Sequence, residues 1–309
     1  MKKTVQVVFS AAGVALFQVI YNSFYFLSSL IPPDATLENP LSFSLNEVFS
    51  TSFLMNFEPE MSFLPGAINR MAFFFVFCLF ACRFLAKDYC LTGVYTFTRQ
   101  VKKSHWYVKR VGNLAGFAFL YTAVYLGLGL ICCFSVAGGE LVDTKELLYL
   151  ILSPLVNYTL FLTAISLLIN LISIQFGSSA GFIGVWLAIV LCLTLLFSAY
   201  PVVMEPLLRS DPELQNSGYL AAQLPLWMLL LVAINPLSHV ILNFHAAPSE
   251  LVNLSLSNRR QLSGNIEFIN LPSWMFSIGY LLVFTVITVS LGWLYLRKKD
   301  ISLINHETL

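Results

Sequence analysis

Six stretches of largely apolar residues constrain the fold of this chain more than any motif does. Each is about 20 residues long or longer, which is what a helix needs to cross the hydrocarbon core of a membrane. Helices satisfy their own backbone hydrogen bonds there, so we expect an all-α polytopic membrane protein with a single transmembrane domain over residues 1–309. The six predicted transmembrane helices are Val5–Leu30, Gly66–Ala86, Val111–Val136, Leu147–Ile174, Gly181–Met204 and Ser273–Leu296.

The composition agrees with a membrane location. Hydrophobic residues make up 58% of the chain and charged residues only 11%, whereas a soluble domain carries about 25% charged residues. The net charge is only +1, which gives no indication of a nucleic-acid partner. The first apolar stretch is too long for the apolar region of a signal peptide, about 7–15 residues, so we expect an uncleaved first span.

The charges are distributed unevenly between the gaps that separate the spans. Twelve of the 17 Lys and Arg residues fall in or beside four basic stretches, with only three of the 16 acidic residues. Because basic loops stay in the cytoplasm, this pattern predicts a multi-pass protein of the plasma membrane with both termini cytoplasmic. The basic stretches are Lys2–Lys3, Arg83–Lys87, Arg99–Arg110 and Arg297–Lys299.

A seventh apolar stretch, Leu220–Phe244, is interrupted by Pro225 and by Asn235-Pro236. Counting it as a span would put the two basic termini on opposite sides of the membrane, against the positive-inside rule. We therefore predict a re-entrant or surface-lying broken helical pair on the outer side, between spans five and six. It belongs to the longer of two outer loops, 31–65 and 205–272.

The first outer loop has its own helical signal. Ser44 and Glu47 form a capping-box pattern, and apolar residues including Phe49 and Phe53 follow at helical spacing. We expect an amphipathic helix that lies on the outer membrane surface or packs on the spans.

The cytoplasmic connection, residues 87–110, mixes aromatic and aliphatic residues with basic ones. It is too apolar for a solvated loop and too polar for a span, so a short helix or turn at the membrane surface is predicted. Two interpretations stay open: an interfacial loop that sets the topology, or a docking surface for a cytoplasmic partner.

Span four carries a stripe of polar residues for which two roles are also possible. Its members lie on one helical face, because they are spaced alternately by four and three residues. They either hydrogen-bond to neighbouring helices or line a pathway for an amphipathic substrate. The stripe consists of Thr159, Thr163, Ser166, Asn170 and Ser173.

Motifs for catalysis are weak. The sequence Gly177–Gly181 matches G-x-S-x-G, but it joins two predicted spans and is interpreted as a tight turn. The histidines His105, His239, His245 and His306 form no metal-binding pair and are expected to be polar surface residues. The chain has no Gly-Lys dipeptide and hence no phosphate loop, and the span centres hold no acid. We expect no enzyme activity, metal or cofactor in this chain.

The layout of spans and loops resembles the ABC-2 type permease subunit of bacterial ABC transporters. This resemblance implies that the connection between spans two and three couples to a separate ABC ATPase subunit, which binds ATP and Mg. It implies a second permease, the same or a sister chain, and an outer gate at Pro225, Asn235 and Pro236. In that family spans two and five line the path, which favours helix packing for the span-four stripe and draws attention to Phe73, Phe77, Trp186, Leu195 and Phe197. The implied coupling residues are Asp88, Tyr89, Val94, Tyr95, Phe97, Arg99, Lys102, Lys103, His105 and Trp106.

The leading hypothesis is therefore the membrane-spanning, non-catalytic subunit of an ABC exporter. Its aromatic-rich spans without buried charge favour a hydrophobic or amphipathic cargo, such as a peptide antibiotic, a lipid or a drug. The alternative is an accessory or signalling membrane protein that binds a cytoplasmic partner through the same basic 87–110 loop.

Overall fold

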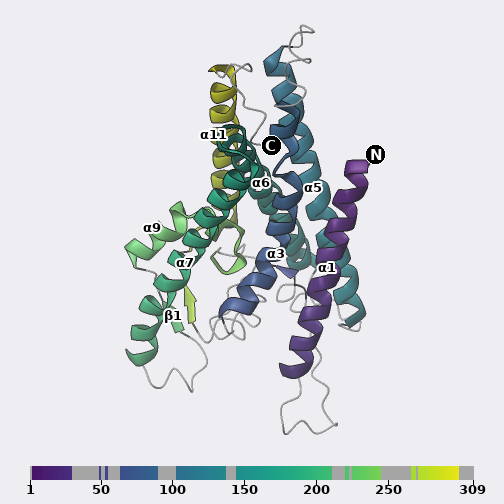
Figure 1. Cartoon of the computed structure of the whole chain (residues 1–309). Coiled ribbons are helices and arrows are strands. Elements are labelled where there is room, and N and C mark those ends of the chain that lie inside the picture. Colours follow the sequence, from purple (N-terminus) through teal and green to yellow (C-terminus); the bar gives the residue numbers. More distant parts are fainter. Residues whose placement is uncertain are drawn as a thin grey trace.

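The computed structural model describes residues 2–29, 49, 53–54, 63–89, 102–136, 144–210, 220–222, 225–244, 266–268 and 271–298. Helices dominate this part of the chain (Figure 1). The long ones are α1 (Lys2–Ser29), α3 (Phe63–Ala81), α5 (Lys103–Val136), α6 (Thr144–Phe176), α7 (Ser178–Ser210) and α11 (Trp274–Lys298). The short elements are α9 (Leu226–Ile234), the 3₁₀ turns η1 (Ser238–Val240) and η2 (Leu242–Phe244), and the strands β1 (Leu220–Ala222) and β2 (Ile266–Phe268).

Five helices in the described part of the chain are long and apolar enough to cross a membrane. They coincide with five of the six predicted spans, so the protein is a multi-pass, largely helical membrane protein. Each of these helices is about 30 Å long or longer, which is enough to cross the hydrocarbon core of a bilayer. The candidate spans are Lys3–Tyr21, Lys103–Phe134, Leu147–Phe176, Ser178–Ala199 and Trp274–Lys298.

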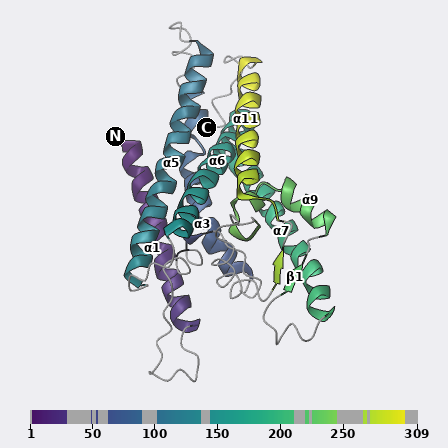
Figure 2. The same cartoon turned by 180° about the vertical axis from the view of Figure 1, so that it is seen from behind.

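Helix α6 is the centre of the bundle. It packs against α3, α5, α7 and α11, and α5 packs in turn against α1 (Figures 1 and 2). The most apolar part of α6 is 61% buried, against only 22% for α7 and for α11. The outward faces of α7 and α11 are apolar side chains, as lipid contact requires.

The second predicted span, Gly66–Ala86, differs from a simple helix. Helix α3 ends at Ala81, Cys82 and Arg83 form a turn, and a short helix follows over residues 84–89. This segment is not among the five candidate spans. The break lies close to the basic end of the bundle, where the cytoplasmic connection is expected to begin.

The described residues of the first outer loop pack on the bundle. Phe49, Phe53 and Leu54 are all buried, and the Phe53 ring lies edge-on to Tyr125, 5.8 Å between centroids. A Cβ on Gly129 would approach the Phe53 ring to 2.6 Å, so the ring sits directly on the bare backbone of α5. The capping-box residues Ser44 and Glu47 lie outside the described residues.

The two short strands pair in parallel, with Leu220 opposite Ile266 and Ala222 opposite Phe268. They join the two ends of the second outer loop, since β1 precedes α9 and β2 precedes α11.

Candidate functional site

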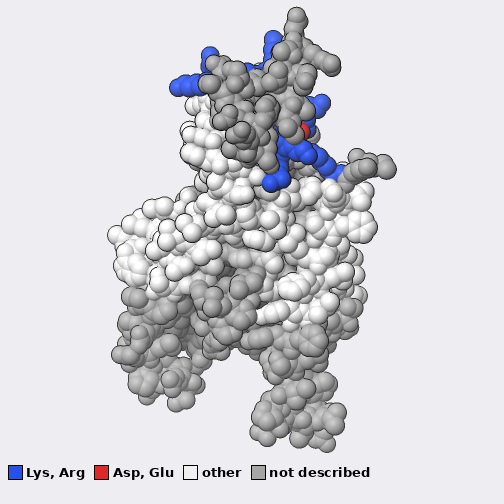
Figure 3. All heavy atoms as spheres, viewed as in Figure 1, with Lys and Arg blue, Asp and Glu red and all other residues white. Residues whose placement is uncertain are grey.

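The positive charges gather at one end of the bundle. Figure 3 shows Lys and Arg concentrated over the starts of α1 and α5 and the end of α11, above a described surface on which this view shows no charged side chain. Asp88 lies among them and is the only acid whose side chain the structure describes. Arg70 and Lys145, in contrast, lie in the first halves of α3 and α6, towards the opposite end. The basic-end residues are Lys3, Arg83, Lys87, Lys102, Lys103, Lys109, Arg110, Arg297 and Lys298.

The two ends of the 87–110 connection are held together at this basic end. The guanidinium of Arg110 lies 2.9 Å from the Asp88 carboxylate, and the rings of Tyr89 and Trp106 are 5.8 Å apart. Trp106 and Tyr89 are buried, whereas both members of the ion pair are partly exposed. These four residues bring the two ends of the connection into one packed contact, which we call the inner joint.

Two other helices contribute to the inner joint. The ammonium group of Lys3, near the start of α1, lies 4.4 Å from the centre of the Phe84 ring. The Arg83 Nε–H donates to the hydroxyl of Ser178, at the start of α7, over 3.2 Å. The joint thus ties residues 83–89 to α1, α5 and α7.

Asn170 of α6 binds the break between α3 and helix 84–89. Its Nδ2 donates to the carbonyl oxygens of Ala81 and Ser166, both over 2.7 Å. Its Oδ1 accepts from the backbone N–H groups of Leu85 (2.7 Å) and Ala86 (3.1 Å). Two donors and two acceptor sites are all that an amide side chain has, so the fully buried Asn170 is completely satisfied.

The other members of the predicted stripe also face the interior. Thr163, Ser166 and Ser173 are buried and Thr159 is half-buried. The Thr159, Thr163 and Ser173 hydroxyls donate to the carbonyl four residues earlier in α6, over 2.6–2.7 Å. Asn170 differs from these three in that its side chain also bonds to the backbone of a neighbouring segment, at Ala81 and Leu85.

The predicted coupling residues divide into three groups. Asp88, Tyr89 and Trp106 meet in the inner joint, while Lys102 and His105 are exposed and Lys103 is half-buried beside it. Val94, Tyr95, Phe97 and Arg99 lie outside the described residues. Of the side chains to which the family resemblance draws attention, Phe73 and Phe77 are buried inside the chain and Leu195 is exposed on α7.

The outer broken segment packs on α7 and α11. Helix α9 begins after the half-buried Pro225 and ends at Ile234, and Asn235-Pro236 redirects the chain. The side chain of Asn235 donates to the Cys192 carbonyl of α7 over 2.8 Å and accepts from the Leu237 N–H over 3.0 Å. The predicted break is therefore present, and Asn235 fastens it to α7.

His239 is buried, so the expectation of a polar surface residue is wrong for it. Its Nε2–H donates to the Ala233 carbonyl (3.1 Å), its Nδ1 accepts from the Ser277 hydroxyl (2.9 Å), and the ring stacks on Tyr280 at 4.0 Å. Burial lowers the pKa of His239 to about 4, although the bond to Ala233 opposes this shift. The ring is therefore neutral at ordinary pH. No periodic pattern around His239 indicates this burial, because its partners Ser277 and Tyr280 lie in α11.

Side chains also satisfy the carbonyl groups that the end of α9 leaves without a helical partner. The Ser238 hydroxyl donates to Val232, and the Tyr280 hydroxyl donates to Ile234. Together with the bond from His239, these contacts give side-chain donors to three carbonyl groups at the end of α9.

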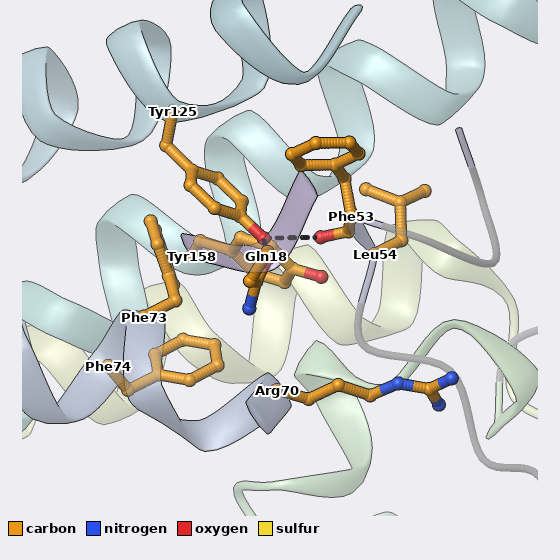
Figure 4. Close-up of a pocket in the computed structure, with 8 residues that line it drawn as sticks. All are labelled: Gln18, Phe53, Leu54, Arg70, Phe73, Phe74, Tyr125 and Tyr158. Atoms are coloured by element: carbon orange, nitrogen blue, oxygen red, sulfur yellow. Dashed lines mark hydrogen bonds between the residues drawn. The ribbon is translucent and has the colours of Figure 1, made fainter. Parts of the chain in front are cut away.

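A small hollow lies between α1, α3, α5, α6 and the first outer loop (Figure 4). It is small, with about 10 Å³ of free space, which is room for about one water molecule, and it is lined mainly by aromatic rings. The Tyr125 hydroxyl donates to the Phe53 carbonyl over 2.9 Å and also hydrogen-bonds with the Gln18 side chain. Arg70, which our sequence reasoning did not single out, borders the hollow, and Figure 4 shows its guanidinium directed away from the rings. The sequence does contain a signal for it, because an Arg inside a predicted span and far from its basic end is uncommon.

Comparisons with known proteins give no assignment: no family model, no curated protein and no solved structure matches this chain.

Proposed function

We propose that this chain is the membrane-spanning permease subunit of an ABC exporter, similar in layout to the ABC-2 type. A separate subunit binds ATP and Mg and hydrolyses the ATP. The observation that carries the proposal is the inner joint, which ties both ends of the 87–110 connection to α1, α5 and α7 at the basic end. A partner that docks on this connection would act on several helices at once.

The proposal includes six spans in the plasma membrane, with α3 and helix 84–89 as the second and both termini cytoplasmic. The start of α1 and the end of α11 lie at the same basic end, which supports this orientation (Figures 1 and 3). The segment from α9 to η2 is then the outer re-entrant pair. Its side-chain-capped helix end supports that role, because open backbone groups are not tolerated in lipid.

A second permease, identical or related, would pair with this chain. The exposed α7 side chains Ile183, Leu187 and Leu191 form an apolar face that suits a partner helix, lipid or a hydrophobic cargo. The interior position of the span-four stripe supports helix packing as its role. The burial of Phe73 and Phe77 leaves α7 as the better candidate for a pathway wall.

Charge reversal on the exposed part of the connection tests the docking role. Lys102→Glu with His105→Glu should abolish copurification of the ATPase subunit, since both side chains are exposed and outside the inner joint. Arg297→Glu with Lys298→Glu is the matched control: it makes the same change on the same basic end, away from the connection. Equal retention of the partner by both double variants would refute docking on the connection. A chain that purifies with no ATPase at all would favour the accessory or signalling alternative.

A further inference from the structure

The amide of Asn170 occupies the place of a helical hydrogen bond. In an uninterrupted helix the Leu85 N–H would donate to the Ala81 carbonyl. Here the Asn170 side chain stands between these two groups, with Nδ2 bound to Ala81 and Oδ1 to Leu85. A side chain inserted into the hydrogen-bond ladder is an established cause of sharp helix kinks, typically of more than about 20°.

The same backbone groups therefore have two satisfied arrangements. In the bent arrangement, which the structure shows, Asn170 holds Ala81 and Leu85 apart. In a continuous arrangement Leu85 would bond directly to Ala81, and α3 would run straight into helix 84–89. Asn170 favours the bent arrangement because straightening would leave its buried amide without three of its four partners.

The residues beyond the break connect this bend to the cytoplasmic side. Phe84, Asp88 and Tyr89 all lie on helix 84–89, and they contact Lys3, Arg110 and Trp106. A displacement of the 87–110 connection must therefore move helix 84–89. Helix 84–89 is linked to the central helix α6 through Asn170, which accepts from the Leu85 and Ala86 N–H groups.

We propose that Asn170 is a positioning residue that forms the hinge between α3 and helix 84–89 and relays movement of the 87–110 connection to α6. The existence of the hinge depends only on the geometry above. The relay rests on the proposed docking of an ATPase on the connection.

Distances between spin labels test the hinge on the purified chain alone, in lipid nanodiscs. One label pair joins Lys87→Cys to Val286→Cys on α11, and a reference pair joins Leu79→Cys on α3 to the same α11 site; all three positions are exposed. The native cysteines are replaced for this purpose. Asn170→Leu removes the amide and keeps the branched outline of the side chain, with a somewhat larger volume. Because helix 84–89 is about 9 Å long, a change of about 20° moves its far end by about 3 Å.

Lys87 lies about two thirds of the way along this helix, so we expect Asn170→Leu to shift the Lys87 distance by about 2 Å and to leave the Leu79 distance unchanged. Asn157→Leu is the matched control, since Asn157 is also a buried asparagine of α6 but, within the described part of the chain, does not hydrogen-bond to α3. Unchanged Lys87 distances, or equal shifts with both substitutions, would overturn the hinge. If Asn170→Leu does not give a monodisperse protein, Asn170→Ala removes the same amide without added bulk and carries the same expectation.

A second readout separates the relay from the proposed function. With the ATPase bound, Asn170→Leu should leave copurification intact and change the rate of ATP hydrolysis several-fold, whereas Asn157→Leu should not. An unchanged rate with a shifted hinge would overturn the relay and leave the permease assignment standing. Absence of any ATPase partner would overturn both the assignment and the relay, while the label distances would still report on the hinge.

Discussion

Replacing Gly181 by Ala should open the turn between α6 and α7. The hairpin is very tight: Gly177 has a φ of 90°, in the left-handed region that favours glycine, and Gly181 N–H donates to the Gly177 carbonyl over 3.1 Å. A Cβ on Gly181 would lie 2.6 Å from the Ile169 carbonyl oxygen and 2.8 Å from the Ser173 nitrogen. These are backbone atoms, so no side-chain rotation can relieve the overlap.

The expected loss of stability is about 2 kcal/mol. Overpacking costs about 1–3 kcal/mol, and the rigid backbone contacts put this site at the upper end of that range. The better helix propensity of Ala offsets about 1 kcal/mol. Gly184, one turn further along α7, is the matched control, because nothing lies within 4 Å of a Cβ placed there. Gly184→Ala should therefore raise stability by about 0.5–1 kcal/mol.

Unfolding by added denaturing detergent, followed by loss of helix signal and by size-exclusion chromatography, measures this difference. The same substitution at two sites of one helix should move the unfolding midpoint in opposite directions. The free energies of unfolding of the two variants should differ by about 3 kcal/mol. If Gly181→Ala proved as stable as Gly184→Ala, the close α6–α7 contact would be wrong.

Three further predictions concern the inner joint, the outer segment and the first outer loop. A double-mutant cycle on Asp88→Ala and Arg110→Ala should give a coupling energy of about 1 kcal/mol or less, because the ion pair is partly exposed; about 3 kcal/mol would contradict that exposure. The folded-state pKa of His239 lies below its ordinary value of 6.5, so its contribution to stability is complete above pH 6.5 and is lost as the pH falls towards about 4. His239→Gln should remove this part of the pH dependence of unfolding, which an unchanged profile would contradict. Phe53→Ala should destabilise the protein by about 3–5 kcal/mol as a buried Phe, whereas Phe119→Ala on the exposed face of α5 should cost far less; equal losses would show that the loop is not packed on Gly129.

Hydropathy located the spans well because each needs a long apolar run, but it did not locate their ends. Helix α5 begins at Lys103 rather than Val111, since its basic first turns continue the helix beyond the apolar region. Hydropathy predicts a second span that is continuous to Ala86, whereas the helix breaks at Cys82-Arg83. That break depends on Asn170 of another helix, which no local pattern of α3 could indicate.

The sequence predicts several residues of the candidate site but not how these residues contact one another. The polar stripe identified Asn170 as a member of a face, yet its insertion into α3 is a tertiary contact between residues far apart in sequence. His239 was expected at the surface because histidine is usually polar and exposed. Its burial follows from Ser277 and Tyr280, which approach only once α11 packs on the broken segment.

The most direct test of the account is to purify the tagged chain from its native host in mild detergent, identify the proteins that accompany it, and assay vanadate-sensitive ATP hydrolysis. The account predicts a stoichiometric ATPase subunit with a phosphate loop, and hydrolysis that vanadate inhibits. A stable chain that purifies alone and hydrolyses no ATP would contradict the permease assignment.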